Sequence, residues 1–263
     1  MQNQTFESID FSIENQVGYI SINNPPANTL STTTINGLSE CFKQAQANQG
    51  IEVIVITGKG KMFVAGADIK EFTEAFNDTQ KGKKLSQDAQ AVMNTIESCT
   101  KPVIAAINGA CLGGGLELAM SCHLRIAADE AKLGQPELNL GLIPGFGGTQ
   151  RLARITNKAK ALELILTGQF IGGQEAEKIG LVNKSVPLAE LMNETKKLAE
   201  SIAINKSAES VKATLIAVNE GMATTLEKGL EIEAEQWAQL FETENMVEGV
   251  NAFMEKRKPD FKD

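Results

Sequence analysis

Two short, almost wholly apolar segments constrain the fold of this chain more than any other feature of its sequence. They are IEVIVITG at 51–58 and PVIAAING at 102–109, and their length and β-branched residues are typical of strands buried on both faces. HLRIAA at 123–128 has the same character. Between the first two segments, apolar residues recur at helical spacing: Leu85, Ala89, Val92 and Ile96. Strands that alternate with helices in this way favour an α/β core.

The C-terminal part of the chain changes character. Residues 157–168 and 173–180 have the pattern of short helices, and from about residue 188 onward there is little strand signal. One helical stripe near the end is strongly apolar and consists of Leu226, Leu230, Ala234, Trp237 and Phe241. A stripe of this kind predicts packing on another surface, either the core or a neighbouring subunit.

Two glutamates each lie beside a glycine-rich turn. Glu117 occurs in NGACLGGGLELAM at 108–120, and Glu137 occurs in LGQPELNLGLIPGFGGTQR at 133–151. Glycines that open a helix leave backbone N–H groups free and allow a ligand to approach closely. Carboxylates beside such N–H groups can transfer protons while the N–H groups stabilise a developing anion. This combination suits chemistry at an activated carbonyl such as a thioester.

Composition excludes several classes of function. The formal net charge of −8 argues against nucleic acid and anionic membranes as partners. The four cysteines form no CxxC pair and lack a histidine at metal-ligand spacing, so no metal site is predicted. Their apolar surroundings indicate reduced thiols in a cytoplasmic protein. The N-terminus resembles neither a signal peptide nor a mitochondrial presequence, and no apolar run is long enough to span a membrane.

Five segments of the chain, in order, resemble those of the enoyl-CoA hydratase/isomerase (crotonase) superfamily, and within it the enoyl-CoA hydratases. The segments cover nearly the whole chain: FVAGADIKEF at 63–72, PVIAAINGACLGGGLELAMSC at 102–122, AKLGQPELNLGLIPGFGGTQRLAR at 131–154, LTGQFIGGQEAEKIGLVNKSV at 166–186 and NAFMEKRKPDF at 251–261. A single glycine run would be a weak signal. Five ordered segments that keep both glutamates are a specific one.

The resemblance implies a fold that the periodicities alone do not give. This fold is an α/β spiral of repeated ββα units, followed by a C-terminal helical region that mediates trimerisation. We therefore expect a catalytic core at 1–195 and an oligomerisation region at 196–263. The expected assembly is a homo-oligomer, either a trimer or a dimer of trimers.

The resemblance also assigns the reacting groups. It implies that the backbone N–H groups of Ala67 and Gly114 form an oxyanion hole for the thioester oxygen. Glu117 would activate the water as a base, and Glu137 would supply the proton to Cα. The apolar neighbours of Glu117 indicate burial, and a buried carboxylate needs a partner or a function. The context of Glu137 is less informative, so its role depends on the resemblance.

Contacts with the acyl-CoA are implied at seven further positions, which are Ala27, Ala65, Asp68, Ile69, Lys70, Phe253 and Lys256. Asp68 has a structural alternative, because an aspartate often fixes its own loop. Lys59, Lys61 and Lys70 could attract the phosphates of coenzyme A, and each could equally be an ordinary loop lysine. No prosthetic group is expected, since coenzyme A is part of the substrate.

The predicted activity is the hydration of a trans-2-enoyl-CoA to a 3-hydroxyacyl-CoA, as in fatty-acid β-oxidation. An enoyl-CoA isomerase, or another acyl-CoA lyase or hydrolase of the crotonase type, is the enzymatic alternative. Retention of both Glu117 and Glu137 favours hydration. A relative that binds RNA or serves as a scaffold is the non-enzymatic alternative, which the negative charge disfavours. The lone His123 and the absence of GxSxG argue against a Ser–His–Asp hydrolase.

Overall fold

The computed structural model of the protein describes residues 3–261. Met1 and Gln2, which begin the segment where no signal peptide is predicted, therefore lie outside the described residues. Within the described range none of the helices combines the length and the apolar composition needed to cross a membrane.

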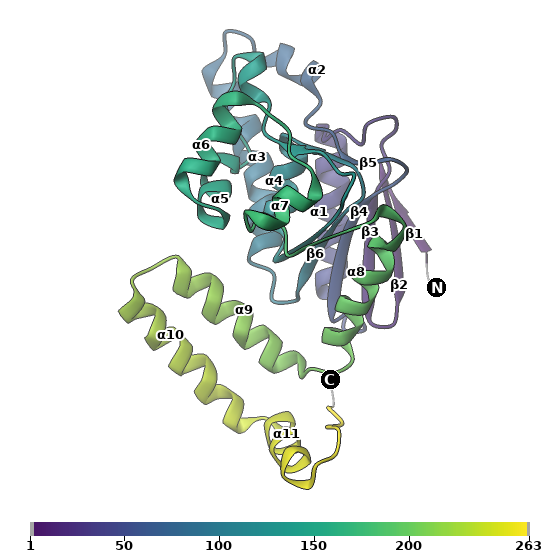
Figure 1. Cartoon of the computed structure of the whole chain (residues 1–263), viewed down its shortest axis with the longest axis vertical. Coiled ribbons are helices and arrows are strands. Elements are labelled where there is room, and N and C mark those ends of the chain that lie inside the picture. Colours follow the sequence, from purple (N-terminus) through teal and green to yellow (C-terminus); the bar gives the residue numbers. More distant parts are fainter. Residues whose placement is uncertain (1–2, 262–263) are drawn as a thin grey trace.

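A seven-stranded mixed sheet forms the centre of the molecule, and each predicted buried strand lies in it (Figure 1). The order of its strands is β1 (Asn3–Phe6), β2 (Ile9–Glu14), β3 (Val17–Ile22), β4 (Val53–Gly58), β6 (Val103–Ile107), β8 (Leu124–Ala128) and β10 (Lys184–Val186). The first three strands are antiparallel, and all pairs from β3 to β10 are parallel. Parallel strands need crossover connections, and here these connections carry the helices.

A second, three-stranded sheet accompanies the first. Its strands are β5 (Met62–Val64), β7 (Ala110–Leu112) and β9 (Leu133–Gly134), and they pair in parallel. Each follows a strand of the large sheet and precedes one or more helices, so strand, strand and helix recur three times along the chain. This repetition confirms the predicted spiral of ββα units. The segment at 59–72 contains β5 and α2 (Ile69–Phe72), and elements of three or four residues carry too little periodicity to be detected from the sequence.

Helices cover both faces of the large sheet. One face packs against α1 (Thr32–Ala47), α3 (Thr79–Glu97) and α4 (Gly114–Ser121). The opposite face packs against α8 (Leu188–Ala203), through Ala199 and Ala203. The predicted boundary between residues 195 and 196 thus falls inside α8, and the packed core continues to Ala203 because the last turns of this helix lie on the sheet. The remaining elements of the core are η1 (Thr73–Ala75), η2 (Glu137–Leu140), α5 (Gly148–Ile155), α6 (Lys158–Thr167) and α7 (Gly173–Lys178).

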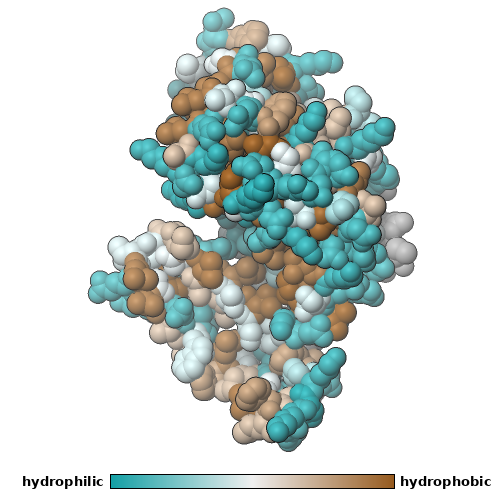
Figure 2. Space-filling view, viewed as in Figure 1, coloured by the Kyte–Doolittle hydropathy of each residue, from teal (hydrophilic) through white to brown (hydrophobic). Residues whose placement is uncertain are grey.

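The chain ends in three helices that stand away from the sheet (Figure 1). We call them the C-terminal extension: α9 (Ala208–Met222), α10 (Leu226–Gln239) and α11 (Glu244–Glu255), with η3 (Leu240–Glu242) between the last two. The helices α9 and α10 form an antiparallel hairpin, whose close approach is allowed by Gly221 facing Gly229. The predicted apolar stripe on α10 does not pack on the core, since Trp237 is 63% exposed. Figure 2 shows hydrophobic atoms over this extension and the adjoining part of the core.

Candidate functional site

The start of α4 organises the site. Gly113 precedes the helix with φ of 52°, and Gly114 is the first helical residue. Glu117 lies in the first turn and is only 1% exposed. Its Oε1 atom accepts hydrogen bonds from the backbone N–H groups of Phe146 (2.7 Å) and Gly148 (2.6 Å). The buried carboxylate is thus held through one oxygen by the turn at 146–148, and its other oxygen is not used in these two bonds.

The second glutamate approaches the same helix start from a different turn. Glu137 begins η2, and a methyl group built on Gly113 would lie 2.9 Å from its Oε1 atom. In the amide orientation that satisfies both groups, the side-chain nitrogen of buried Gln135 donates to Oε1 (3.0 Å) and Oε2 (3.2 Å) of Glu137. Both carboxylates therefore lie beside the first turn of α4, although the two glutamates are twenty residues apart in the sequence.

Burial shifts the acidity of both groups toward neutrality. The pKa of Glu117 is raised to about 7, because desolvation and the charge of Glu137 outweigh the lowering effects of the N–H bonds from the 146–148 turn and of the Arg151 charge. Desolvation likewise raises the pKa of Glu137 to about 6. Two carboxyl groups with pKa values near the working pH are suited to giving and taking protons.

Two backbone N–H groups lie next to the carboxylates without an acceptor. Leu30 pairs with Ala67 through bonds to Gly66 O and from the Asp68 N–H, so the N–H of Ala67 points away from Leu30. Gly114 is in the first turn of α4, where N–H groups have no partner within the helix. In the part of the chain that the structure describes, neither group donates to another residue. A methyl group on Gly114 would lie 3.5 Å from the Ala67 nitrogen, so the two donors face one small space.

The predicted CoA-contact residues of the N-terminal half meet in one place. The Ala65 N–H donates to Ala27 O at 3.0 Å, which puts the 27–30 segment beside the 65–68 segment. The buried side chain of Asn28 fixes this arrangement by donating to Met62 O and Lys59 O. Ile69 and Lys70 follow on an exposed helix.

Asp68 has the geometry of its structural alternative. Its carboxylate caps α2 and accepts from the Lys70 N–H at 3.0 Å. Lys59 is paired with Asp10, so its charge is partly neutralised within the chain.

The two C-terminal candidates lie far from the rest of the site within one chain. Phe253, which is 85% exposed, and Lys256 are in or directly after α11, at the opposite end of the molecule from α2 (Figure 1). Their predicted contact with CoA thus requires another subunit.

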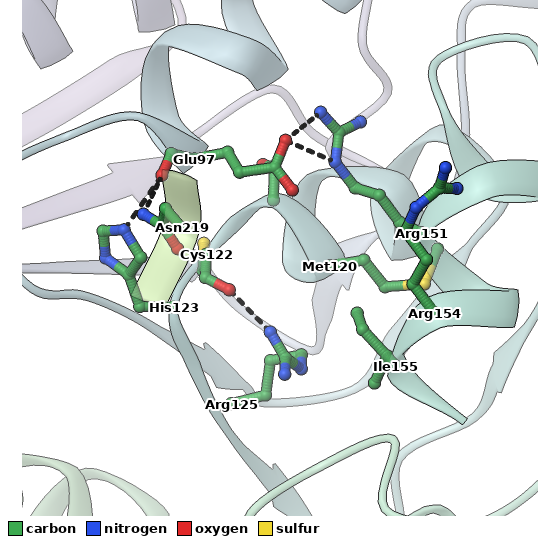
Figure 3. Close-up of a pocket in the computed structure, with 10 residues that line it drawn as sticks. Glu97, Met120, Cys122, His123, Arg125, Arg151, Arg154, Ile155 and Asn219 are labelled. Carbon is green, nitrogen blue, oxygen red and sulfur yellow. Dashed lines mark hydrogen bonds and ion pairs between the residues drawn. The ribbon is translucent and has the colours of Figure 1, made fainter. Parts of the chain in front are cut away.

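His123 has a structural position that matches the sequence interpretation. Its Nδ1 atom accepts from the Val103 N–H (2.9 Å), and its Nε2 atom lies 3.1 Å from Glu97 O (Figure 3). Burial lowers the pKa of the imidazole, so the ring is a neutral bridge between β6 and α3.

Four groups near the carboxylates were not predicted from the sequence. They are the side chains of Gln135 and Arg151 and the N–H groups of Phe146 and Gly148. Pro136 and the glycines of GFGG at 145–148 predict turns near Glu137. Nothing in these residues predicts that the second turn binds Glu117. Backbone donors have no residue-type signature, because every residue except proline supplies one.

Comparison with known proteins identifies the family. Residues 12–263 match the model of the enoyl-CoA hydratase/isomerase family. A "Probable enoyl-CoA hydratase" of Bacillus subtilis is 47% identical to this chain, and the match covers 97% of this chain and 98% of the relative. A "Crotonyl-CoA hydratase" of Syntrophomonas wolfei is 42% identical, and the match again covers 97% of this chain and 98% of the relative. A solved structure of enoyl-CoA hydratase from Bacillus anthracis superposes with a TM-score of 0.91, at 37% identity and covering 97% of this chain and 99% of that one. The chain belongs to the enoyl-CoA hydratase/isomerase family.

Proposed function

We propose that this protein is an enoyl-CoA hydratase, which adds water to a trans-2-enoyl-CoA and gives a 3-hydroxyacyl-CoA. One observation carries the proposal: two carboxyl groups with raised pKa values and two free backbone N–H groups converge on the first turn of α4. The names of the relatives in Bacillus and Syntrophomonas agree with this chemistry. The presence of both glutamates favours hydration over isomerisation.

In the proposed reaction, the thioester oxygen accepts from the N–H groups of Ala67 and Gly114. Glu117 takes a proton from water while the water oxygen forms a bond to Cβ, and the electron pair of the C=C bond moves toward the thioester oxygen as an enolate. Glu137 then donates its proton to Cα, and the carbonyl reforms. Loss of one such N–H donor typically costs about 3–4 kcal/mol of transition-state stabilisation.

Burial raises the pKa of both carboxyl groups, to about 7 for Glu117 and to about 6 for Glu137. Hydration starts with Glu117 ionised and Glu137 protonated, and dehydration starts from the reverse arrangement. Raised pKa values suit both groups to both roles, because each group can then give and take a proton near neutral pH.

We further propose that no prosthetic group is needed and that coenzyme A enters only as part of the substrate. The exposed apolar stripe on α10 and the distance of Phe253 from α2 support a homo-oligomer, a trimer or a dimer of trimers, in which a neighbouring subunit covers the C-terminal extension. A cytoplasmic location and a role in fatty-acid β-oxidation complete the proposal.

Crotonyl-CoA is the appropriate first substrate, since one relative is named for it. Addition of purified protein should cause loss of the absorbance of the conjugated enoyl thioester, and mass spectrometry should find the mass of one added water. Unchanged absorbance at high enzyme concentration, with longer enoyl-CoA substrates also unchanged, would refute the hydratase assignment. A shift of the double bond without added water would instead support the isomerase alternative.

A further inference from the structure

Beyond the groups that would touch substrate, we infer that Arg151 is a positioning residue that sets the orientation of Glu117 through the 146–148 turn. The inference rests on the proposed function, because it concerns the base of that reaction. Arg151 lies in α5, and its residue is only 8% exposed. It makes no direct hydrogen bond to Glu117, so it would act through the turn between them.

The guanidinium of Arg151 lies inside the 146–148 turn. Its Nη1 atom donates to Phe146 O at 3.1 Å, and the N–H of the same Phe146 residue donates to Glu117 Oε1. A methyl group on Gly147, which has φ of 113°, would lie 2.1 Å from Nη1. The turn therefore wraps closely around the guanidinium, and only glycine allows both this backbone conformation and this approach.

The other nitrogens of Arg151 are held by α3. Nη2 donates to Asn94 Oδ1 at 2.7 Å. Nη2 also donates to Glu97 Oε2 (2.7 Å), and Nε donates to the same Glu97 oxygen at 3.2 Å (Figure 3). Arginine presents its donors in a rigid planar fork. Because α3 fixes one side of that fork, the remaining donor fixes Phe146 O, and the turn then presents two N–H groups to Glu117.

Arg151 also acts on Glu117 by charge. Its positive charge lowers the pKa of the buried carboxyl group, against the raising effects of desolvation and of Glu137 from the η2 turn. The backbone N–H groups of Phe146 and Gly148 act in the same direction as Arg151. A base must be ionised to take a proton, so loss of the arginine charge would leave less of the active form at a given pH.

An ion pair that merely joins α3 to α5 would have the same contacts, so the test needs measurements that this role would not change. The variants are R151Q, which removes charge and fork, and R151K, which keeps the charge. R154Q is the matched control, because Arg154 lies one turn later in α5, is exposed, and bonds only to Gln150 among described residues. Rates of crotonyl-CoA hydration are measured across pH, together with thermal unfolding.

We expect R151Q to lose about 100-fold in kcat with KM nearly unchanged, the size of effect that a small misplacement of a reacting group produces. The acidic limb of its pH profile should move to higher pH. R151K should recover part of kcat and keep the profile of the unaltered protein, and R154Q should match the unaltered protein in every respect.

Normal kcat in folded R151Q would overturn the inference, as would a loss of activity that follows only the folded fraction, with the pH profile unmoved. If R151Q does not fold, R151K decides the matter: full kcat in R151K would overturn the positioning role. Absence of hydration by the unaltered protein would contradict the proposed function instead, so the two failures are distinguishable.

Discussion

The helices α4 and α10 differ in how far their residues are buried within a single chain. All eight residues of α4 are buried, including a carboxylate, and the contacts of each face are supplied by the same chain. Within the described residues α10 has no buried side chain, although its stripe holds the only tryptophan of the sequence. Trp237 packs edge-on against Phe241, with ring centroids 4.5 Å apart, and both remain mostly exposed.

This difference separates two kinds of information in the sequence. The α4 region encodes a site whose geometry is complete at the level of its backbone donors and carboxylates. The C-terminal extension encodes apolar area that only a further surface can remove from water, and exposed apolar area of this extent is typical of interaction sites. The proposed reaction centre is thus enclosed by a single chain, whereas the apolar stripe of the C-terminal extension is exposed.

The largest expected effect concerns assembly, and its absence would contradict the interpretation of α10 as an interface. Replacing Trp237 or Leu230 with aspartate should dissociate the oligomer, because a charge would be buried without a partner in the interface. Light scattering should then give a mass near 28.2 kDa, the mass of one chain, and several times that mass for the unaltered protein. The exposed Glu233, changed to glutamine, is the control on the same helix. A single-chain mass for the unaltered protein would show that the stripe is not an interface.

The next effect tests the formed centre. E117Q and E137Q should each lower kcat for crotonyl-CoA by about 10²–10⁴-fold, the usual contribution of a positioned acid or base. Circular dichroism should show the unaltered helix content, because the glutamine oxygen can still accept a hydrogen bond, from the 146–148 turn at position 117 and from the Gln135 side chain at position 137. Near-normal turnover in either variant would remove that residue from the mechanism.

A pair of glycines sharpens the contrast between the site and the surface. G114A would place a methyl group 3.1 Å from the Phe146 ring and 3.5 Å from the Ala67 nitrogen. The variant keeps its own N–H group, but the methyl group would hold the thioester oxygen away from the two donors, so kcat should fall by about 10²-fold, an effect as large as the loss of one donor. G82A adds its methyl group in open space on α3 and should leave kcat unchanged while stabilising the helix by about 0.5–1 kcal/mol. Steady-state kinetics and chemical unfolding test both, and equal kinetics for the two variants would contradict the assigned donor position.

The smallest effect is thermodynamic and depends on pH. The pKa of Glu117 rises from 4.5 to about 7 on folding, so the ionised carboxylate destabilises the fold by about 3 kcal/mol above pH 7. A raised pKa means that the stability is complete below pH 4.5 and is lost as the pH rises through the folded value. E117Q, which cannot ionise, should therefore be more stable than the unaltered protein at pH 8 and equal to it near pH 4.5. A stability difference that does not change with pH would contradict this linkage.

The sequence predicted the large features well and the small ones poorly. The strands β4, β6 and β8 were predicted because each carries a run of buried apolar residues, and the helical C-terminal extension was predicted from its 3.6-residue periodicity. The strands β5, β7 and β9 have two or three residues each, too few to show a period. At the site, Glu117 and Glu137 were identified as candidates from the glycine-rich turns beside them, and their separate roles came from the resemblance. The hydrogen bond from Arg151 to Phe146 O could not be predicted, because every residue has a backbone carbonyl and the sequence does not show which one a side chain reaches.

The pairing of Leu30 with Ala67 affects how the proposed site can change by mutation during evolution. The two N–H groups proposed to hold the thioester oxygen belong to the main chain, and their direction comes from bonds made by Gly66, Asp68 and the start of α4. No change of side chain at position 67 deletes the donor there, except a change to proline. Each carboxylate, by contrast, is lost by a single substitution to any residue other than aspartate. Mutation can therefore replace the acidic and basic side chains of the proposed site while the two backbone N–H donors to the thioester oxygen are kept.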